Sequence, residues 1–133
     1  MKKMITDKKE SQSLGMPWEK EYGYAQAVKK GDTAWLAGQV GHTEQGVLLT
    51  GMEAQVRQSY VNIKKLLAGF DMNMDDVVEE VLYVLDIDEA FNARKKIGRE
   101  FYPDPMGIPS TLIQVSGLAL PGQLIEIKII AKQ

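Results

Sequence analysis

The sequence predicts an α+β fold in which two helices cover one face of a mixed sheet and leave the other face bare. Three observations support this prediction. The length of 133 residues is that of one domain. Apolar residues recur at helical spacing between about residues 50 and 68. Apolar residues alternate at strand spacing between residues 124 and 131. Together with the elements described below, these patterns predict the order ββ(β)αβαββ.

The composition is that of a globular protein and excludes several kinds of site. Hydrophobic residues make up 44% of the chain and charged residues 26%, and the net charge of -2 offers no broad attraction for nucleic acid or an anionic membrane. No cysteine and one histidine, His42, exclude disulfides, thiolate nucleophiles and multi-histidine metal centres. No apolar run resembles a signal peptide core or a membrane span. We therefore expect a cytoplasmic protein without a metal or cofactor.

The first third of the chain predicts an arm followed by a hairpin. Residues 1–15 are polar without a period, and we expect a loose arm ahead of a single domain over residues 16–133. Residues 22–29 and 33–40 indicate two strands joined by a turn at Gly31-Asp32. The glycine-rich stretch that follows, up to Gly51, indicates a long loop or a weak edge strand.

A long helix is predicted next. Thr50 and Glu53 have the spacing of a capping box, the helix ends near Ala68, and Gly69 stands where a left-handed cap is expected. Four apolar residues at helical spacing predict the buried stripe: Val56, Tyr60, Ile63 and Leu67.

The second half predicts a strand, a helix and two further strands. Residues 77–85 are rich in β-branched side chains and indicate a strand. Asp86 or Asp88 can cap a helix that ends near Tyr102. Its expected inner face holds Phe91, Ile97 and Phe101, and its expected outer face holds Arg94, Lys95, Lys96 and Arg99. Residues 110–118 and 124–131 indicate the last two strands.

The last strand carries apolar side chains on both faces. One face holds Ile125, Ile127, Ile129 and Ala131, and the other holds Leu124, Glu126, Lys128 and Ile130. A sheet face as apolar as the second one usually marks an interface when helices do not cover it. The pattern therefore predicts a homo-oligomer.

Five segments in order resemble the YjgF/Rid family, also called the L-PSP family: residues 23–27, 36–40 and 55–63, Pro109-Ser110-Thr111, and residues 125–131. The resemblance covers about residues 22–131. It implies a chorismate-mutase-like sandwich, a homotrimer whose sheets form an internal barrel, and small-molecule clefts between the subunits.

The family's best-understood activity is the hydrolysis of enamine or imine intermediates to a 2-oxo acid and ammonia. An arginine of a Pro-x-Arg motif binds the substrate carboxylate in that family, and a glutamate of the last strand positions water. Thr111 stands at the arginine position here, and Glu126 stands at the glutamate position. Ile113 replaces a small thiol-bearing residue, and a helix asparagine of the family falls at or near Lys95.

The candidate site therefore comprises Glu126 as the catalytic residue and Tyr24, Gly38, Thr111 and Ile113 as substrate-binding residues. Simpler interpretations remain for three of them. Glu126 can pair with Lys128 on a wet face, Tyr24 can be a half-buried strand aromatic, and Gly38 can mark a bulge. We expect His42 to be solvated in its loop.

Three functions fit these residues unequally. The first is a hydrolase of the Rid type with an altered substrate range, since a threonine hydroxyl cannot replace a bidentate guanidinium. The second is a non-catalytic metabolite-binding or regulatory trimer. The third is an endoribonuclease, which the sequence disfavours because no pair of basic side chains converges on a phosphate and no aromatic set accompanies the basic helix run. A chorismate mutase would need more cations than three arginines on helices provide.

Overall fold

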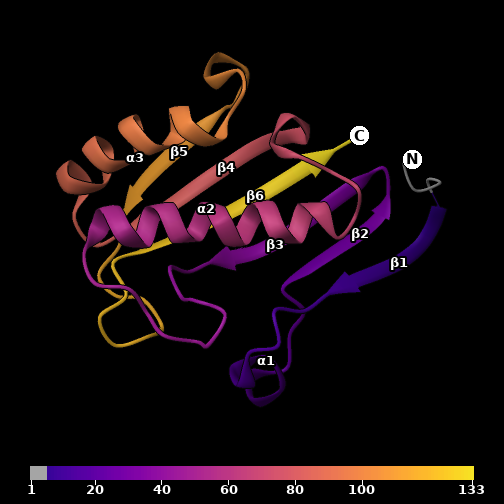
Figure 1. Cartoon of the computed structure of the whole chain (residues 1–133), viewed down its shortest axis with the longest axis horizontal. Helices are drawn as coiled ribbons and strands as arrows, with labels where there is room; N and C mark the ends of the chain where they lie inside the picture. The colour runs from indigo at the N-terminus through magenta and orange to yellow at the C-terminus, as the bar shows by residue number, and fades with distance from the viewer. Residues whose placement is uncertain (1–5) are drawn as a thin grey trace.

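The computed structural model describes residues 6–133 and shows a six-stranded sheet with two long helices packed on one face (Figure 1). The strands lie in the order β1-β2-β3-β6-β4-β5; β4 and β5 are parallel, and the other neighbours are antiparallel. No helix in this part of the chain is long and apolar enough to cross a membrane. The elements are β1 (Thr6–Gln12), α1 (Pro17–Tyr22), β2 (Ala27–Gly31), β3 (Thr33–Gln39), α2 (Met52–Ala68), β4 (Val77–Val84), α3 (Ile87–Phe101), β5 (Ser110–Gln114) and β6 (Ile125–Lys132).

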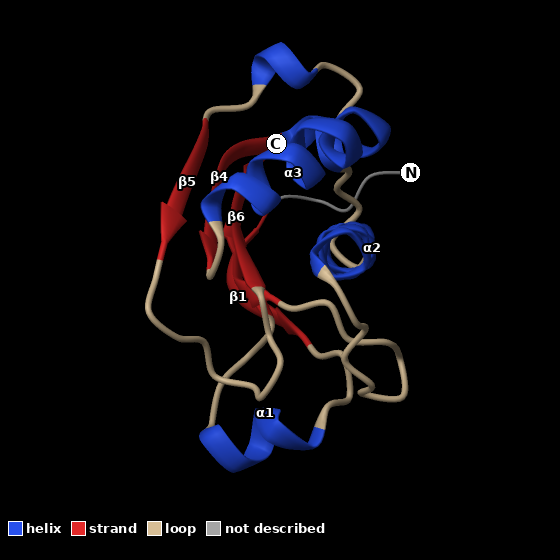
Figure 2. Cartoon of the chain, turned by 90° about the vertical axis from the view of Figure 1, so that its left-hand side faces the viewer, coloured by secondary structure: helices blue, strands red, loops and turns tan. Residues whose placement is uncertain are grey.

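This arrangement confirms the α+β fold with a mixed sheet covered on one face by two helices. Figure 2 shows α2 and α3 on the same side of the sheet, while α1 lies below its lower end. The core fills the space between the two helices and the sheet, where the four predicted residues of β6 and the four of the α2 stripe are fully buried. Side-chain alternation and helical period suffice to predict these faces because both are local properties of the backbone.

The N-terminal arm differs from the expectation over residues 6–12, while residues 1–5 lie outside the described part. Residues 6–12 form the edge strand β1, which pairs with β2. An edge strand obtains its stability from backbone hydrogen bonds and does not need an apolar pattern, so the polar sequence of residues 6–12 gave no strand signal.

The strand predicted over residues 22–29 begins later than expected, at Ala27. Pro17 opens the short helix α1, and Gly23 ends it in the left-handed region with φ 89°.

The ends of α2 are not built as predicted. Gly51, with φ 93°, occupies the N-cap position, and no side chain caps the helix. The Glu53 carboxylate instead accepts a hydrogen bond from Lys96 of α3 at 2.7 Å. Gly69 has a right-handed conformation, and a Cβ atom at this position would overlap the side-chain amide of Gln12, so the glycine provides space for β1. Both predictions fail because tertiary partners replaced the local caps.

The faces of α3 differ from the prediction at two residues, Phe91 and Arg94. Asp86 caps the helix and Ile97 is buried, as expected, but Phe91 is 57% exposed. Arg94 turns inward and forms an ion pair with Glu80 at 2.7 Å. The reason is Glu80 itself, since a carboxylate with no solvent contact requires a cation beside it.

Glu80 is the centre of a buried polar cluster between α2, α3 and the sheet. Its carboxylate accepts hydrogen bonds from Tyr60 at 2.6 Å, from Tyr102 at 2.7 Å and from Ser110 at 2.5 Å, besides the Arg94 contact. Burial, followed by the charge of Glu80, raises the pKa of both tyrosines, so both hydroxyls remain protonated donors. The cluster links both long helices to the first residue of β5.

The uncovered sheet face carries rows of paired side chains. Val28, Trp35 and Ile130 form one row across β2, β3 and β6, and Ile113, Tyr83 and Glu126 form another across β5, β4 and β6. Trp35 is 43% exposed and Ile113 is 40% exposed. The expected strand over residues 110–118 is shorter than predicted and ends at Gln114.

Candidate functional site

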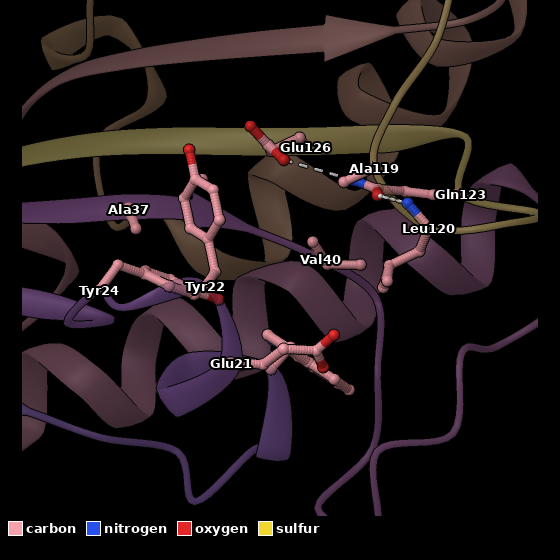
Figure 3. A pocket seen from close by; sticks show the side chains of 11 residues that line it. Glu21, Tyr22, Tyr24, Ala37, Val40, Ala119, Leu120, Gln123 and Glu126 are labelled. Atoms are coloured by element: carbon pink, nitrogen blue, oxygen red, sulfur yellow. Dashed lines mark hydrogen bonds between the residues drawn. The ribbon is translucent and has the colours of Figure 1, made fainter.

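A cleft of about 830 Å³ opens at the end of the sheet above α1 (Figure 3). Its volume lies within the range usual for small-molecule sites. The walls come from α1, the chain that leads into β2, the end of β3, the loop before β6 and β6 itself. The lining residues are Trp18, Glu21, Tyr22, Tyr24, Ala37, Gly38, Val40, Ala119, Leu120, Gln123 and Glu126.

The structure brings together three of the residues selected from the sequence, namely Tyr24, Gly38 and Glu126. The register between β3 and β6 is interrupted between Leu36 and Gln39, so Gly38 lies in an irregular stretch of the pairing. A Cβ atom on Gly38 would overlap the carboxylate of Glu126. An irregular pairing of the strands and a close approach to Glu126 therefore occur together at Gly38, and the absence of a side chain there leaves room for Glu126.

Glu126 has little local restraint. Gln123 Nε2 donates a long hydrogen bond of 3.5 Å to the Glu126 carboxylate. Among residues 6–133, Glu126 has no ion-pair partner. The pairing with Lys128 is therefore absent. A half-buried carboxylate at the wall of a cleft, free of a cation, is available to a ligand or to water.

Tyr24 and Trp18 form an aromatic wall opposite Glu126. Gln26 Nε2 donates a hydrogen bond to the Tyr24 hydroxyl oxygen at 3.3 Å. Burial raises the pKa of Tyr24, and the charges of Glu19 and Glu126 raise it further. The Tyr24 hydroxyl therefore stays neutral and can donate a hydrogen bond toward the cleft.

His42 supports this wall from behind. Contrary to the expectation of a solvated loop histidine, it is 3% exposed. Its Nδ1 lies 2.9 Å from the carbonyl oxygen of Thr43, and its ring contacts Trp18 edge-on at a centroid distance of 5.1 Å. Asn62 of α2 donates to the His42 carbonyl oxygen at 3.0 Å and so anchors the loop. The histidine has a packing role that its position in a polar loop did not indicate.

Glu19 holds α1, and with it the aromatic wall, against the sheet. Its buried carboxylate accepts hydrogen bonds from Ser13 Oγ at 2.6 Å, from the backbone N–H groups of Leu14 and Met16 at 3.1 Å, and from Gln26 Nε2 at 3.2 Å. Burial raises the pKa of Glu19, but the hydrogen bonds outweigh it and the pKa falls below the usual 4.5. Its ionised form therefore stabilises the fold.

Replacing Glu19 with glutamine should lower the free energy of unfolding at pH 7 by about 1 to 2 kcal/mol, because the amide cannot accept all four hydrogen bonds. A carboxylate whose pKa is depressed by folding contributes fully above its unfolded pKa and loses this contribution as the pH falls through the folded value. The difference between wild type and Glu19→Gln should therefore be largest at neutral pH and shrink below about pH 4.5. Urea unfolding monitored by tryptophan fluorescence at several pH values measures it, and a difference independent of pH would contradict the assignment.

Thr111 and Ile113 do not line the cleft of the single chain. Both lie on β5, on the same sheet face as Glu126, but β4 separates them from β6. Two strand spacings put Ile113 roughly 10 Å from Glu126. Lys95 is exposed on α3, which covers the opposite face of the sheet, and so lies away from the cleft.

Sequence reasoning missed the residues that α1 contributes: Trp18, Glu21 and Tyr22. One signal for this helix was present, because Pro17 and Gly23 have the spacing of an N1 proline and a C-terminal glycine cap. The loop residues Ala119, Leu120 and Gln123 were also missed. Only the fold brings this loop beside α1.

Comparisons with known proteins agree with this architecture. A family model described as Endoribonuclease L-PSP matches residues 18–133. The RutC family protein YjgH of Escherichia coli (strain K12) is 30% identical over 112 residues, which is 84% of each chain. A 2-iminobutanoate/2-iminopropanoate deaminase of Dermatophagoides farinae is 29% identical over 91 residues, which cover 67% of this chain and 70% of the relative.

Solved structures show the same fold. The crystal structure of Rv2704 from Mycobacterium tuberculosis, a member of the YjgF/YER057c/UK114 family, superimposes with a TM-score of 0.83 at 25% identity, covering 95% of this chain and all of that one. The structure of protein YJGH gives a TM-score of 0.79 at 25% identity, with 98% and 95% covered. The family model, the relatives and the shared fold show that this chain belongs to the YjgF/Rid family.

Proposed function

We propose that the protein is a hydrolase of imines or enamines that works as a homotrimer, with a small-molecule cleft at each subunit boundary and Glu126 as its catalytic residue. The observation that supports this most is the Glu126 carboxylate, which lies over Gly38 in an aromatic-walled cleft without an ion-pair partner among residues 6–133. One relative bears the name of a deaminase that acts on 2-imino acids, and this supports chemistry at a C=N bond.

Glu126 supplies the proton transfers that the reaction needs. The carboxylate accepts a proton from water as the water oxygen bonds to the imine carbon, and the π electrons of the C=N bond move to nitrogen. Glu126 then returns the proton to nitrogen. As the C–N bond breaks and ammonia leaves, Glu126 accepts the proton of the carbinolamine hydroxyl, the carbonyl forms, and ammonia takes up this proton. In balance, one iminium ion and one water give one carbonyl compound and one ammonium ion. The neutral Tyr24 hydroxyl can hold the attacking water or the carbinolamine oxygen.

The trimer supplies the part of the cleft that the single chain lacks. Thr111 and Ile113 are exposed on the uncovered sheet face, two strands from Glu126 of their own chain. Packing of these faces around a threefold axis buries Trp35 and Ile113 and can bring β5 of one subunit to the cleft of the next. No cofactor is required by this chemistry.

Sedimentation should show a species of about 44 kDa, which corresponds to three chains of 14.8 kDa each. The physical reason is the half-apolar sheet face, since exposed patches of this kind are rare on stable monomers. Analytical ultracentrifugation at micromolar concentration measures the mass. A stable monomer at this concentration would contradict the proposed trimer and the proposed cleft between subunits.

The altered substrate range follows from Thr111 at the family's arginine position. Hydrolysis of freshly generated 2-aminoacrylate should be at least about tenfold slower than with an arginine-bearing family member, because a single neutral hydrogen bond replaces a bidentate charged one. Ammonia release above the spontaneous rate measures this. Turnover equal to that of the arginine-bearing enzyme would contradict the proposed role of Thr111.

The same assay with an imine that lacks a carboxylate tests the hydrolase itself. A flavin amine oxidase acting on 2-phenylethylamine generates the phenylacetaldehyde imine in place, and the protein should accelerate ammonia release from it. Absence of acceleration with any imine, together with specific ligand binding, would favour the alternative of a non-catalytic metabolite-binding protein.

A further inference from the structure

We propose that the cleft binds an organic cation, an ammonium or iminium group on an apolar or aromatic body, and not a carboxylate anion. This inference rests on the proposed function only in placing the ligand site at this cleft. It names a chemical class of ligand that differs from the 2-imino acids in the name of one relative.

The charges at the cleft walls are all negative. Glu21 and Glu126 line the cleft, and no lysine or arginine is among the lining residues. Within residues 6–133 neither carboxylate forms an ion pair with another side chain. An anionic ligand would therefore approach two unpaired carboxylates with no compensating cation, whereas a cation would gain from both.

If β5 of a neighbouring subunit lay beside the cleft, it would not add a positive charge to the cleft walls. Residues 103–127, which include β5 and the loop that leads to β6, contain no lysine or arginine. The cations of α3 lie on the opposite side of the sheet, and Arg94 is occupied by Glu80. Lys128 lies on the same face as Glu126, one row further along β6 and opposite Val81, and it does not line the cleft.

Three aromatic rings offer the second kind of contact that cations prefer. Trp18, Tyr22 and Tyr24 line the cleft, and Figure 3 shows the side chains of Tyr22 and Tyr24 there. The ring centroids of Tyr22 and Tyr24 are 5.8 Å apart and the angle between the ring planes is 68°, so the two faces point in different directions. Tyr22 is 85% exposed, so most of its ring is accessible to a ligand in the cleft. Aromatic faces at an angle beside carboxylates are the arrangement by which proteins recognise ammonium groups.

Three probes with one phenyl scaffold test the inference by isothermal titration calorimetry at pH 7.5: 2-phenylethylamine, which is cationic, 2-phenylethanol, which is neutral, and phenylacetate, which is anionic. We expect the amine to bind about tenfold more tightly than the alcohol, and the carboxylate to bind most weakly. Raising the salt concentration should reduce the preference for the amine and leave the affinity of the alcohol nearly unchanged.

Variants identify the groups responsible. Glu21→Gln should reduce the ratio of amine to alcohol affinity by about threefold to tenfold, and Tyr22→Leu should weaken the amine more than the alcohol. Glu100→Gln removes the same charge from the helix side of the sheet, where Glu100 pairs with Arg57, and should leave the ratio unchanged.

Two outcomes separate this inference from the proposed function. Phenylacetate binding as tightly as the amine, undetectable binding of the amine, or a ratio insensitive to Glu21→Gln would overturn the cation preference even if imines are hydrolysed. Failure of hydrolysis with the affinity order intact would remove the proposed catalysis and leave the cation site standing.

Discussion

Replacing Arg94 with methionine should lower the free energy of unfolding by about 3 to 5 kcal/mol, because the change leaves the carboxylate of Glu80 buried without a cation. Glu80 has no solvent contact, and Arg94 reaches it from α3 at 2.7 Å. The remaining donors from Tyr60, Tyr102 and Ser110 are neutral and cannot balance the charge. Chemical denaturation at one fixed protein concentration, monitored by circular dichroism, measures the loss.

The matched control is Arg57→Met, which breaks another arginine–glutamate pair. Arg57 of α2 contacts Glu100 of α3 at 2.9 Å, but both side chains are more than two fifths exposed. Exposed ion pairs contribute little to stability, so the unfolding midpoint of this variant should stay close to that of wild type. Equal effects of the two substitutions would show that burial of the Glu80 cluster has no special energetic weight.

Replacing Glu126 with glutamine should reduce imine hydrolysis by about 100-fold or more, since general base catalysis contributes at least this much and an amide cannot accept the proton. The substitution preserves the size of the side chain and its contact with Gly38. The Michaelis constant for the phenylacetaldehyde imine should change much less than the turnover number, because the group acts mainly in the transition state.

Three measurements distinguish a catalytic Glu126 from a structural one. Melting temperature and oligomer mass should match wild type, because Glu126 forms no ion pair with other residues in the described part of the chain. Glu100→Gln, which removes a carboxylate far from the cleft, should keep full turnover. Loss of the oligomer in Glu126→Gln, or turnover that does not change, would leave Glu126 with a structural role.

Three of the residues that line the cleft, Tyr24, Gly38 and Glu126, were selected from the sequence, but the residues that α1 contributes were not. Helix α1 has only the residues Pro17–Tyr22, too few for a periodic apolar stripe to stand out. Its position depends on Glu19, whose four hydrogen bonds reach both the preceding loop and Gln26. The Met16 bond has the N-cap to N3 spacing of a capping box, but methionine at the N-cap lacks the Ser or Thr by which that box is found in a sequence, and the other donors follow no fixed spacing.

The sequence by itself determined the α+β class, the buried stripe of α2 and the two faces of β6, because helical and strand periods follow from the local geometry of the backbone. Only the tertiary structure decided that residues 6–12 form an edge strand, that Arg94 turns inward and Phe91 outward, and that His42 is buried. Each of these depends on a partner distant in sequence, namely β2, Glu80 and Trp18. The free energy of burying a charge or pairing a strand edge arises between elements, so no period within a single element records it.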